Sequence, residues 1–286
     1  MLIPIKYLEI HVAHTCNLSC VACGHYSQHH VGGTVSVSQA IAWSKKWNNR
    51  IEPKSLGLLG GEPTLHPELT DFIKAMKRAW PHSQLTLKTN GFFLHRHPAL
   101  RETLLSTQTE LEINCHSEKP DYLFHYQKIL EHIQDWHDIK IILKNSTDEE
   151  KARSWTRKYY GFGNSLLPFE DQNPRKSWQL CNAKYCLTLY EERLWKCPPI
   201  AYLKLIERNY QLSQSWKPYL DYQGLSDDCS DEELRSFVFK EEEAICGMCP
   251  AREIRVKKGD PMKKELLSDP NNSSRSVTDT EEGVTL

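Results

Sequence analysis

Three cysteines near the start of this chain of 286 residues have a spacing that can do chemistry. Cys16, Cys20 and Cys23 lie in the run HTCNLSCVAC, which is a C-x3-C-x2-C pattern. Cysteine thiolates hold iron–sulfur clusters, and a [4Fe–4S] cube normally takes four of them. Three closely spaced cysteines without an obvious fourth predict a cube with one open iron. An open iron can bind a substrate or a cofactor, so this spacing indicates catalysis.

Two other interpretations of this spacing are a disulfide framework and a zinc site. Disulfide frameworks are typical of short secreted chains. This chain is long, and its first residues run into a strand pattern without a signal peptide. Zinc is the stronger alternative, because it also takes thiolate ligands at such spacing. The three cysteines alone leave cluster and zinc open, and they favour the cluster.

A second motif follows a short apolar run of strand length at residues 55–59. Gly60, Gly61, Glu62 and Pro63 come directly after this run. Two glycines and an acid at a strand end leave backbone groups exposed where a ligand can approach closely. Together with the C-x3-C-x2-C pattern, this GGEP segment resembles the radical S-adenosylmethionine (SAM) superfamily. The resemblance extends roughly over residues 5–180.

The resemblance implies roles for these residues. In the superfamily the three cysteines hold a [4Fe–4S] cluster, and its open iron binds the amino and carboxylate groups of SAM. The GGEP segment contacts the SAM amino group. Polar residues that follow later strands are further candidate SAM contacts, although such residues also form turns; here they are Thr89, Asn90 and Asn114. One departure is Ala22, because the superfamily often has an aromatic residue before the third cysteine.

Strand and helix patterns alternate through the first part of the chain. The expected strands are 7–12, 55–59, 84–88, 109–114 and 138–143, and the expected helices are 37–50, 67–80, 98–106, 122–134 and 148–160. This alternation predicts an α/β fold with a parallel sheet and right-handed crossovers. The resemblance sharpens the prediction to a partial (β/α)6 barrel. In such barrels the active site lies at the carboxyl ends of the strands, where the motifs above fall.

Four cysteines of the second half form another pattern: Cys181, Cys197, Cys246 and Cys249. Residues 185–190 and 194–197 have strand patterns, so the first of these cysteines precedes a hairpin and the second ends it. The arrangement resembles the twitch extension of radical SAM enzymes, a shortened relative of the SPASM domain. The resemblance implies that the four cysteines bind one auxiliary [4Fe–4S] cluster. The family usually has a glycine in the hairpin turn, and this chain has Glu191-Glu192-Arg193 instead.

Three further cysteines have weaker claims to a ligand role. Cys186 lies within a predicted strand, where cysteine is more often a small buried apolar residue. Cys229 has acidic neighbours, which disfavour thiolate formation. Cys115 follows a predicted strand and either faces the active site or is a buried thiol.

Several other polar residues lie near the predicted site. Glu9 and His11 share one face of the first strand, where a buried polar pair needs partners, so contact with a substrate is one interpretation. Three histidines follow the cysteine loop and either line the mouth of the site or are solvated loop residues: His25, His29 and His30.

The composition limits the partners and the compartment. The formal net charge is −1 with both signs interspersed, which does not predict a nucleic-acid footprint. No apolar run approaches transmembrane length. Ten cysteines without a secretion signal fit a reducing cytoplasm, so we expect a cytoplasmic protein. We expect a radical SAM partial barrel (1–178), a twitch/SPASM-like auxiliary cluster domain (179–256) and a disordered polar tail (257–286).

The resemblance implies a radical SAM enzyme that takes electrons from a reductant such as flavodoxin or ferredoxin. An auxiliary cluster with four protein ligands has no open iron, which favours electron transfer and hence a substrate oxidation or epimerisation. The first strand begins too early for the leader-binding domain that peptide-modifying relatives often carry. We therefore expect a small molecule such as a sugar or aminocyclitol. A peptide or protein substrate and a non-catalytic metal-binding protein are the alternatives.

Overall fold

One seven-stranded sheet organises the computed structural model, which describes residues 2–146 and 157–254. Its strand order is β5-β4-β3-β2-β1-β6-β7, and every neighbouring pair is parallel except β6 and β7. The strands are β1 (Ile3–Ala13), β2 (Ile51–Gly60), β3 (Gln84–Thr89), β4 (Glu110–Cys115), β5 (Ile141–Asn145), β6 (Cys186–Tyr190) and β7 (Arg193–Trp195). The predicted α/β fold with a parallel sheet is confirmed.

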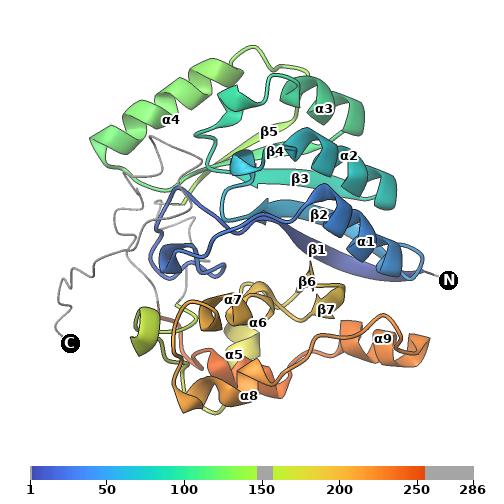
Figure 1. Cartoon of the computed structure of the whole chain (residues 1–286), viewed down its shortest axis with the longest axis vertical. Coiled ribbons are helices and arrows are strands. Elements are labelled where there is room, and N and C mark those ends of the chain that lie inside the picture. Colours follow the sequence, from blue (N-terminus) through green and yellow to red (C-terminus); the bar gives the residue numbers. More distant parts are fainter. Residues whose placement is uncertain (1, 147–156, 255–286) are drawn as a thin grey trace.

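The helices α1 to α4 follow strands β1 to β4 and lie along one side of the sheet, and the remaining described α-helices gather beyond β6 and β7 (Figure 1). The described α-helices are α1 (Val37–Trp47), α2 (Leu69–Ala79), α3 (Leu100–Thr107), α4 (Pro120–Ile133), α5 (Pro174–Leu180), α6 (Pro198–Ala201), α7 (Leu203–Glu207), α8 (Lys217–Leu220) and α9 (Asp231–Phe239). None of the helices in the described part of the chain has the length and apolar character to cross a membrane.

Local sequence explains why the first two of these helices form where they do. Ser36 and Gln39 close a capping box at the start of α1, so two backbone N–H groups at this helix end are satisfied. In α2 the buried residues Leu69, Phe72 and Met76 recur at helical spacing and place one apolar face against the sheet. These helices support β1 and β2 from outside and leave the carboxyl ends of the strands to the loops.

The sixth parallel strand of the sheet is β6, a segment that the sequence patterns assign to the hairpin of the second domain. β6 pairs with β1 in parallel, with Tyr7 opposite Cys186 and Glu9 opposite Thr188. The first strand of the predicted hairpin therefore extends the barrel sheet instead of standing apart from it. The predicted helix 148–160 lies mostly outside the described residues, and 157–160 are not helical. The predicted tail, 257–286, also lies outside the described residues.

The hairpin between β6 and β7 turns tightly without a glycine. Glu191 and Glu192 have φ angles of 47° and 65°, and two such residues in succession are the requirement of a type I′ turn. Positive φ is unfavourable for residues with a side chain, so neighbouring contacts must hold the turn. The indole Nε1 of Trp47 donates to the Glu192 carbonyl at 2.7 Å, and Arg208 pairs with the Glu191 carboxylate at 3.0 Å.

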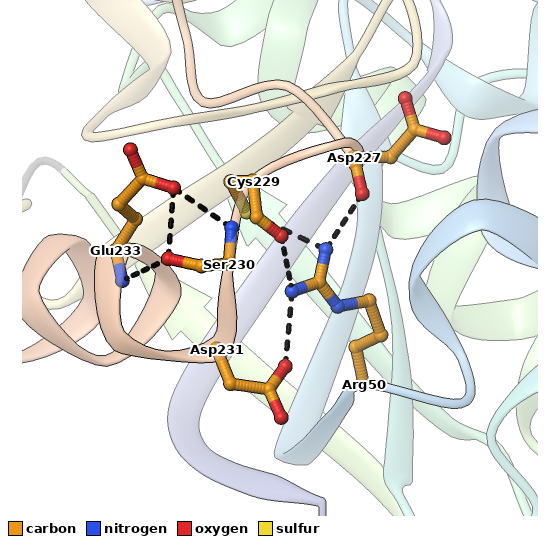
Figure 2. Close-up of polar contacts among 6 residues, drawn as sticks. All are labelled: Arg50, Asp227, Cys229, Ser230, Asp231 and Glu233. Carbon is orange, nitrogen blue, oxygen red and sulfur yellow. Dashed lines mark hydrogen bonds and ion pairs between the residues drawn. The ribbon is translucent and has the colours of Figure 1, made fainter.

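Arg50, which follows α1, binds the segment that leads into α9 (Figure 2). Its guanidinium donates to the backbone carbonyls of Asp227 at 2.6 Å and Cys229 at 2.7 Å, and it pairs with the Asp231 carboxylate at 3.0 Å. It also lies 3.4 Å from the Cys229 sulfur. Cys229 therefore belongs to a structural contact between the carboxyl-terminal region and the amino-terminal end of β2.

We expect Arg50→Ala to lower the free energy of unfolding by about 1–3 kcal/mol, because two carbonyls lose a charged donor. The exposed Asp231 carboxylate contributes little to this loss. Urea unfolding followed by circular dichroism measures the change. Arg101→Ala is the matched control, since Arg101 pairs with the exposed Asp138, and we expect it to cost less than about 1 kcal/mol. Equal effects of the two substitutions would contradict this account of Arg50.

Candidate active site

The loop after β1 carries the three cysteines of the first motif. Cys16, Cys20 and Cys23 are all buried in this loop, between the end of β1 and the 3-10 helix η1 (Ser27–His29). Ala22 and Tyr26 have φ angles of 55° and 61°, so the loop holds two non-glycine residues in the left-handed region. Backbone strain of this kind clusters at functional sites, where the surrounding structure maintains it.

The surroundings of Cys23 favour the thiolate, which is the form that binds metals. Burial alone would raise the pKa of the Cys23 thiol, but hydrogen bonds with His25 and Ser27 outweigh burial and lower this pKa to about 7. The neighbouring thiol of Cys20 lies 3.8 Å from the Nδ1 atom of His116, which belongs to the loop after β4. The sequence places His116 just after the strand predicted at 109–114, at the edge where the active site is expected, but gives it no specific role.

The GGEP segment packs directly against the cysteine loop. Gly61 donates its N–H to the Ala13 carbonyl at 2.7 Å, and the Glu62 N–H donates to the Thr15 carbonyl at 2.8 Å. A Cβ atom on Gly61 would lie 2.2 Å from the Thr15 carbonyl oxygen, so a side chain does not fit there. The glycines therefore allow the ends of β1 and β2 to approach closely.

The Glu62 carboxylate joins three loops of the site. It accepts hydrogen bonds from the backbone N–H of Thr64 at 2.9 Å and of Asn90 at 2.8 Å. The hydroxyls of Thr64 and Thr89 also donate to it. Asn90 in turn donates to the amide oxygen of Asn17 at 2.8 Å, and Asn17 lies in the cysteine loop. The loops after β1, β2 and β3 are thus connected through one buried network.

We expect Glu62→Gln to lower the free energy of unfolding by about 2–4 kcal/mol, because an amide replaces a buried carboxylate that accepts several hydrogen bonds. The amide nitrogen of glutamine is a donor and would face the N–H and hydroxyl donors that now bind the carboxylate, so some of these hydrogen bonds would be lost. Chemical denaturation of the purified variant measures the loss. Glu68→Gln is the same change at an exposed position and is the control. A Glu62→Gln variant as stable as this control would contradict the structural role.

The remaining predicted SAM contact, Asn114, lies near the end of β4. Its side-chain amide is 3.4 Å from the Glu112 carboxylate, and Glu112 pairs with Lys88 and Lys144. Burial opposes ionisation of Glu112, but the two lysines outweigh it and lower the pKa of this carboxyl. Cys115, the next residue, is a buried thiol 3.5 Å from the Ser117 carbonyl.

The four cysteines of the second motif line one small cavity. The cavity is bounded by α5, the start of α6 and the 3-10 helix η6 (Ala244–Met248), and its cysteines are Cys181, Cys197, Cys246 and Cys249. Burial first, and then the thiols of Cys181 and Cys249, raise the pKa of Cys197. All four cysteines thus border the same cavity.

The two spare cysteines of the second half lie elsewhere. Cys186 does not line this cavity, and its sulfur is 3.2 Å from the Glu9 carboxylate. Burial and the neighbouring Glu9 raise the pKa of Cys186. Cys229 is held by Arg50 as described above. The geometry therefore separates both residues from the four cysteines that share the cavity.

A larger cavity of about 430 Å³ is lined by residues that are next to members of both cysteine sets in the chain. From the first cysteine loop it is lined by Ala22, Gly24 and His25, and from the carboxyl-terminal region by Cys186 and Pro199, among others. Polar residues of the strands also reach it, including Glu9 of β1 and Lys88 of β3. A volume of this size is ordinary for a small-molecule site.

The family model of the radical SAM superfamily matches residues 10–160, which is more than half of the chain. The chain belongs to the radical SAM superfamily. Members of this superfamily use a [4Fe–4S] cluster and SAM. This result confirms the resemblance that the two motifs carry, and it makes the protein a member of a family of enzymes.

Curated relatives match a shorter stretch. A probable GTP 3′,8-cyclase of Saccharolobus islandicus is 29% identical over 91 residues, which are 32% of this chain and 29% of the relative. A probable GTP 3′,8-cyclase of Thermoplasma volcanium is also 29% identical over 91 residues, covering 32% of this chain and 27% of its own length. The similarity thus spans less than a third of the length of these two relatives.

Two solved structures of radical SAM proteins are similar to this chain. The crystal structure of BtrN in complex with AdoMet and 2-DOIA covers 90% of this chain and 97% of BtrN, with 14% identity and a TM-score of 0.50. Native anSMEcpe with bound AdoMet and the Cp18Cys peptide covers 49% of this chain and 42% of its own, with 19% identity and a TM-score of 0.38. The likeness to BtrN supports a partial radical SAM barrel as the fold of this chain.

Proposed function

We propose that this radical SAM protein cleaves SAM reductively and abstracts a hydrogen atom from a small-molecule substrate, such as a sugar or aminocyclitol, in an oxidation or epimerisation. The observation that carries the proposal is the large cavity, which is lined by residues next to members of both cysteine sets. When bound, a reduced [4Fe–4S] cluster supplies the electron that cleaves SAM to methionine and a 5′-deoxyadenosyl radical. The side chains of the protein would bind the reacting groups and hold them in the orientation that the reaction needs.

The residues of the first site fit such a cluster and its cofactor. Cys16, Cys20 and Cys23 would hold the cluster, and the lowered pKa of Cys23 favours the thiolate that a ligand must be. The buried side-chain Nδ2 of Asn17 has no hydrogen-bond partner among the described residues. An unpaired buried donor is costly, and an acceptor of a bound cofactor, such as the SAM carboxylate, would satisfy it.

Other candidate contacts surround this position. The GGEP segment (Gly60–Pro63) would bind the SAM amino group, and its backbone is held against the cysteine loop by the hydrogen bonds of Gly61 and Glu62. Thr89, Asn90 and Asn114 would complete the SAM site from the neighbouring strands. Because the Glu62 network orders three of these loops at once, the site is organised before the cofactor arrives.

The second set of cysteines fits an auxiliary cluster, as in a twitch extension. Four sulfur ligands are the normal complement of a [4Fe–4S] cube, and all four of these cysteines line one cavity. Lys158 lies 3.9 Å from the Cys181 sulfur and would offset part of the negative charge of the thiolates. A cluster with a full set of protein ligands favours electron transfer with the substrate over direct substrate binding.

The position of the large cavity supports a small molecule as substrate. The cavity reaches the first cysteine loop on one side and the strand β6 with the start of α6 on the other. A substrate held there would lie between both proposed clusters, within reach of hydrogen abstraction on one side and electron transfer on the other. A flavodoxin or ferredoxin would supply the electrons.

Anaerobic reconstitution followed by incubation with SAM and dithionite tests the core of the proposal. We expect about eight iron and eight sulfide ions per chain, corresponding to two [4Fe–4S] clusters. We also expect 5′-deoxyadenosine and methionine to form in equal amounts. A protein that contains zinc in place of iron, or that carries a reducible cluster and yields no 5′-deoxyadenosine, would overturn the proposed activity.

A further inference from the structure

A cluster of two histidines and one carboxylate lies beside the first cysteine loop, and one of its members, His25, hydrogen-bonds to Cys23. Glu9 and His11 come from the inner face of β1, and His25 comes from the end of the cysteine loop. Each offers one ligand atom, and these three atoms lie within 4.8 Å of one another. Glu9 and His11 are almost fully buried, with 3% and 1% of their surface exposed. They form the one such group of three in the described part of the chain.

The unpartnered nitrogen of His11 is the observation that indicates a missing ligand. The Nε2 atom of His11 is buried and has no hydrogen-bond partner among the residues that the structure describes. The other ring nitrogen, Nδ1, lies 3.0 Å from the Nδ1 atom of His14. If His11 donates this hydrogen bond, its Nε2 carries a lone pair. Histidines that bind metals donate their second ring N–H in this manner.

The surroundings hold the three side chains in place. The ring of Tyr202 stacks on the ring of His11, with centroids 3.5 Å apart and an angle of 16° between the planes. His25 Nε2 lies 2.8 Å from one oxygen of Glu9, and the other oxygen of Glu9 lies 3.2 Å from the Cys186 sulfur. Glu9 and His25 also line the large cavity, so one side of the group is accessible to small molecules.

We propose that Glu9, His11 and His25 bind a divalent transition-metal ion, with Zn²⁺ as the ion that fits best. Two imidazoles and one carboxylate form the ligand set of many three-ligand zinc sites. Imidazole ligands disfavour Mg²⁺ and Ca²⁺, which prefer oxygen. The ion would bind between the His25 imidazole and the Glu9 carboxylate, whose nearest atoms lie 2.8 Å apart. None of the three proposed ligands is a cysteine, and His25 is the one that also contacts the first proposed iron–sulfur centre, through its hydrogen bond with Cys23. The zinc proposal does not depend on the proposed SAM chemistry.

An ion with three protein ligands keeps a coordination position open. Because Glu9 and His25 border the cavity, this position faces the space in which the proposed substrate would bind. A hydroxyl, an amine or water in the cavity would then complete the coordination. The class of ligand that the site takes is therefore a small molecule with an oxygen or nitrogen donor.

Zinc binding to the reconstituted holoprotein tests the proposal. The protein is incubated anaerobically with one equivalent of Zn²⁺, desalted and analysed for zinc, iron and sulfide. We expect about one zinc per chain, with X-ray absorption showing nitrogen and oxygen ligands at about 2.0–2.1 Å and not sulfur at about 2.3 Å. The ligand distances thereby distinguish this site from zinc that has entered a cysteine site.

Substitutions in the site and away from it complete the test. We expect His11→Ala and the nearly isosteric Glu9→Gln to lower the retained zinc at least about tenfold, with iron and sulfide unchanged. His132→Ala is the control, because the exposed His132 lines a separate cavity with His95 and His125. Wild-type protein that retains no zinc, or zinc that persists in both site variants, would overturn the site. Loss of iron alone would count against the proposed SAM chemistry and leave the zinc result standing.

Discussion

We expect Cys20→Ala to abolish the formation of 5′-deoxyadenosine from SAM, with a loss of more than about 100-fold. Even substitutions of outer partners of metal ligands cost about 10–100-fold in metal affinity or activity, and the loss of one of three cluster ligands exceeds that. Cys20 is buried in the middle of the loop after β1. The two remaining cysteines of the loop would not retain the cube, so iron is expected to fall by about four ions per chain. Liquid chromatography of quenched anaerobic reactions measures the product, and elemental analysis measures the iron.

Cys115→Ala is the matched control for this experiment. Cys115 is also a buried cysteine, and it is the last residue of β4, at the edge of the sheet where the site lies, yet it belongs to neither set of proposed ligands. We expect this variant to keep its full iron content and its SAM cleavage. If Cys20→Ala retained cleavage while Cys115→Ala lost it, the assignment of the first cluster would be wrong.

The parallel part of the fold could be predicted because its signals are local. The capping box of Ser36 and Gln39 marks the start of α1, and the apolar positions of α2 recur at helical spacing. The expected strands from 55–59 to 138–143 each overlap an observed strand, although β2 begins four residues earlier, at Ile51. Patterns of this kind depend on neighbours within a few residues, and these are visible in a single sequence.

The place of β6 could not be predicted from such patterns. Its pairing with β1 joins Tyr7 to Cys186, which are far apart in the chain, and no periodicity within either segment specifies its partner. The sequence places the turn that follows at Glu191-Glu192-Arg193, but it does not specify the turn geometry, because Glu191 and Glu192 adopt positive φ without the glycine that usually indicates it. Contacts from Trp47 and Arg208, which come from distant segments, hold this turn.

The candidate site also combines features that are local in the sequence with features that depend on distant segments. The cysteine spacing and the GGEP segment are contiguous motifs, so the sequence could point to them directly. The network that joins Asn17 to Glu62 through Asn90, and the approach of His116 to Cys20, depend on loops that only the folded sheet brings together. The sequence did place Glu9 and His11 on one face of a strand, and the structure adds His25 to that pair.

The second large effect is expected from Cys246→Ala, which would remove the auxiliary cluster and spare the first. Cys246 lies in η6 and lines the cavity that it shares with the other three cysteines of its set. The first cysteine loop does not line the cavity of Cys246, and it makes its own hydrogen bonds to the GGEP segment. We therefore expect iron to fall by about four ions per chain while SAM cleavage stays within a few-fold of wild type.

Electron paramagnetic resonance of the reduced protein separates the two clusters in this experiment, since one of two signals should disappear in Cys246→Ala. Cys229→Ala is the control, because Cys229 lies in the Arg50 contact away from the cavity. This control should show both signals. A Cys246→Ala protein that keeps the first cluster but no longer cleaves SAM would contradict the division of tasks between the two centres. In that case the auxiliary cluster would be needed before the substrate is oxidised, as a route for the electron that SAM cleavage consumes.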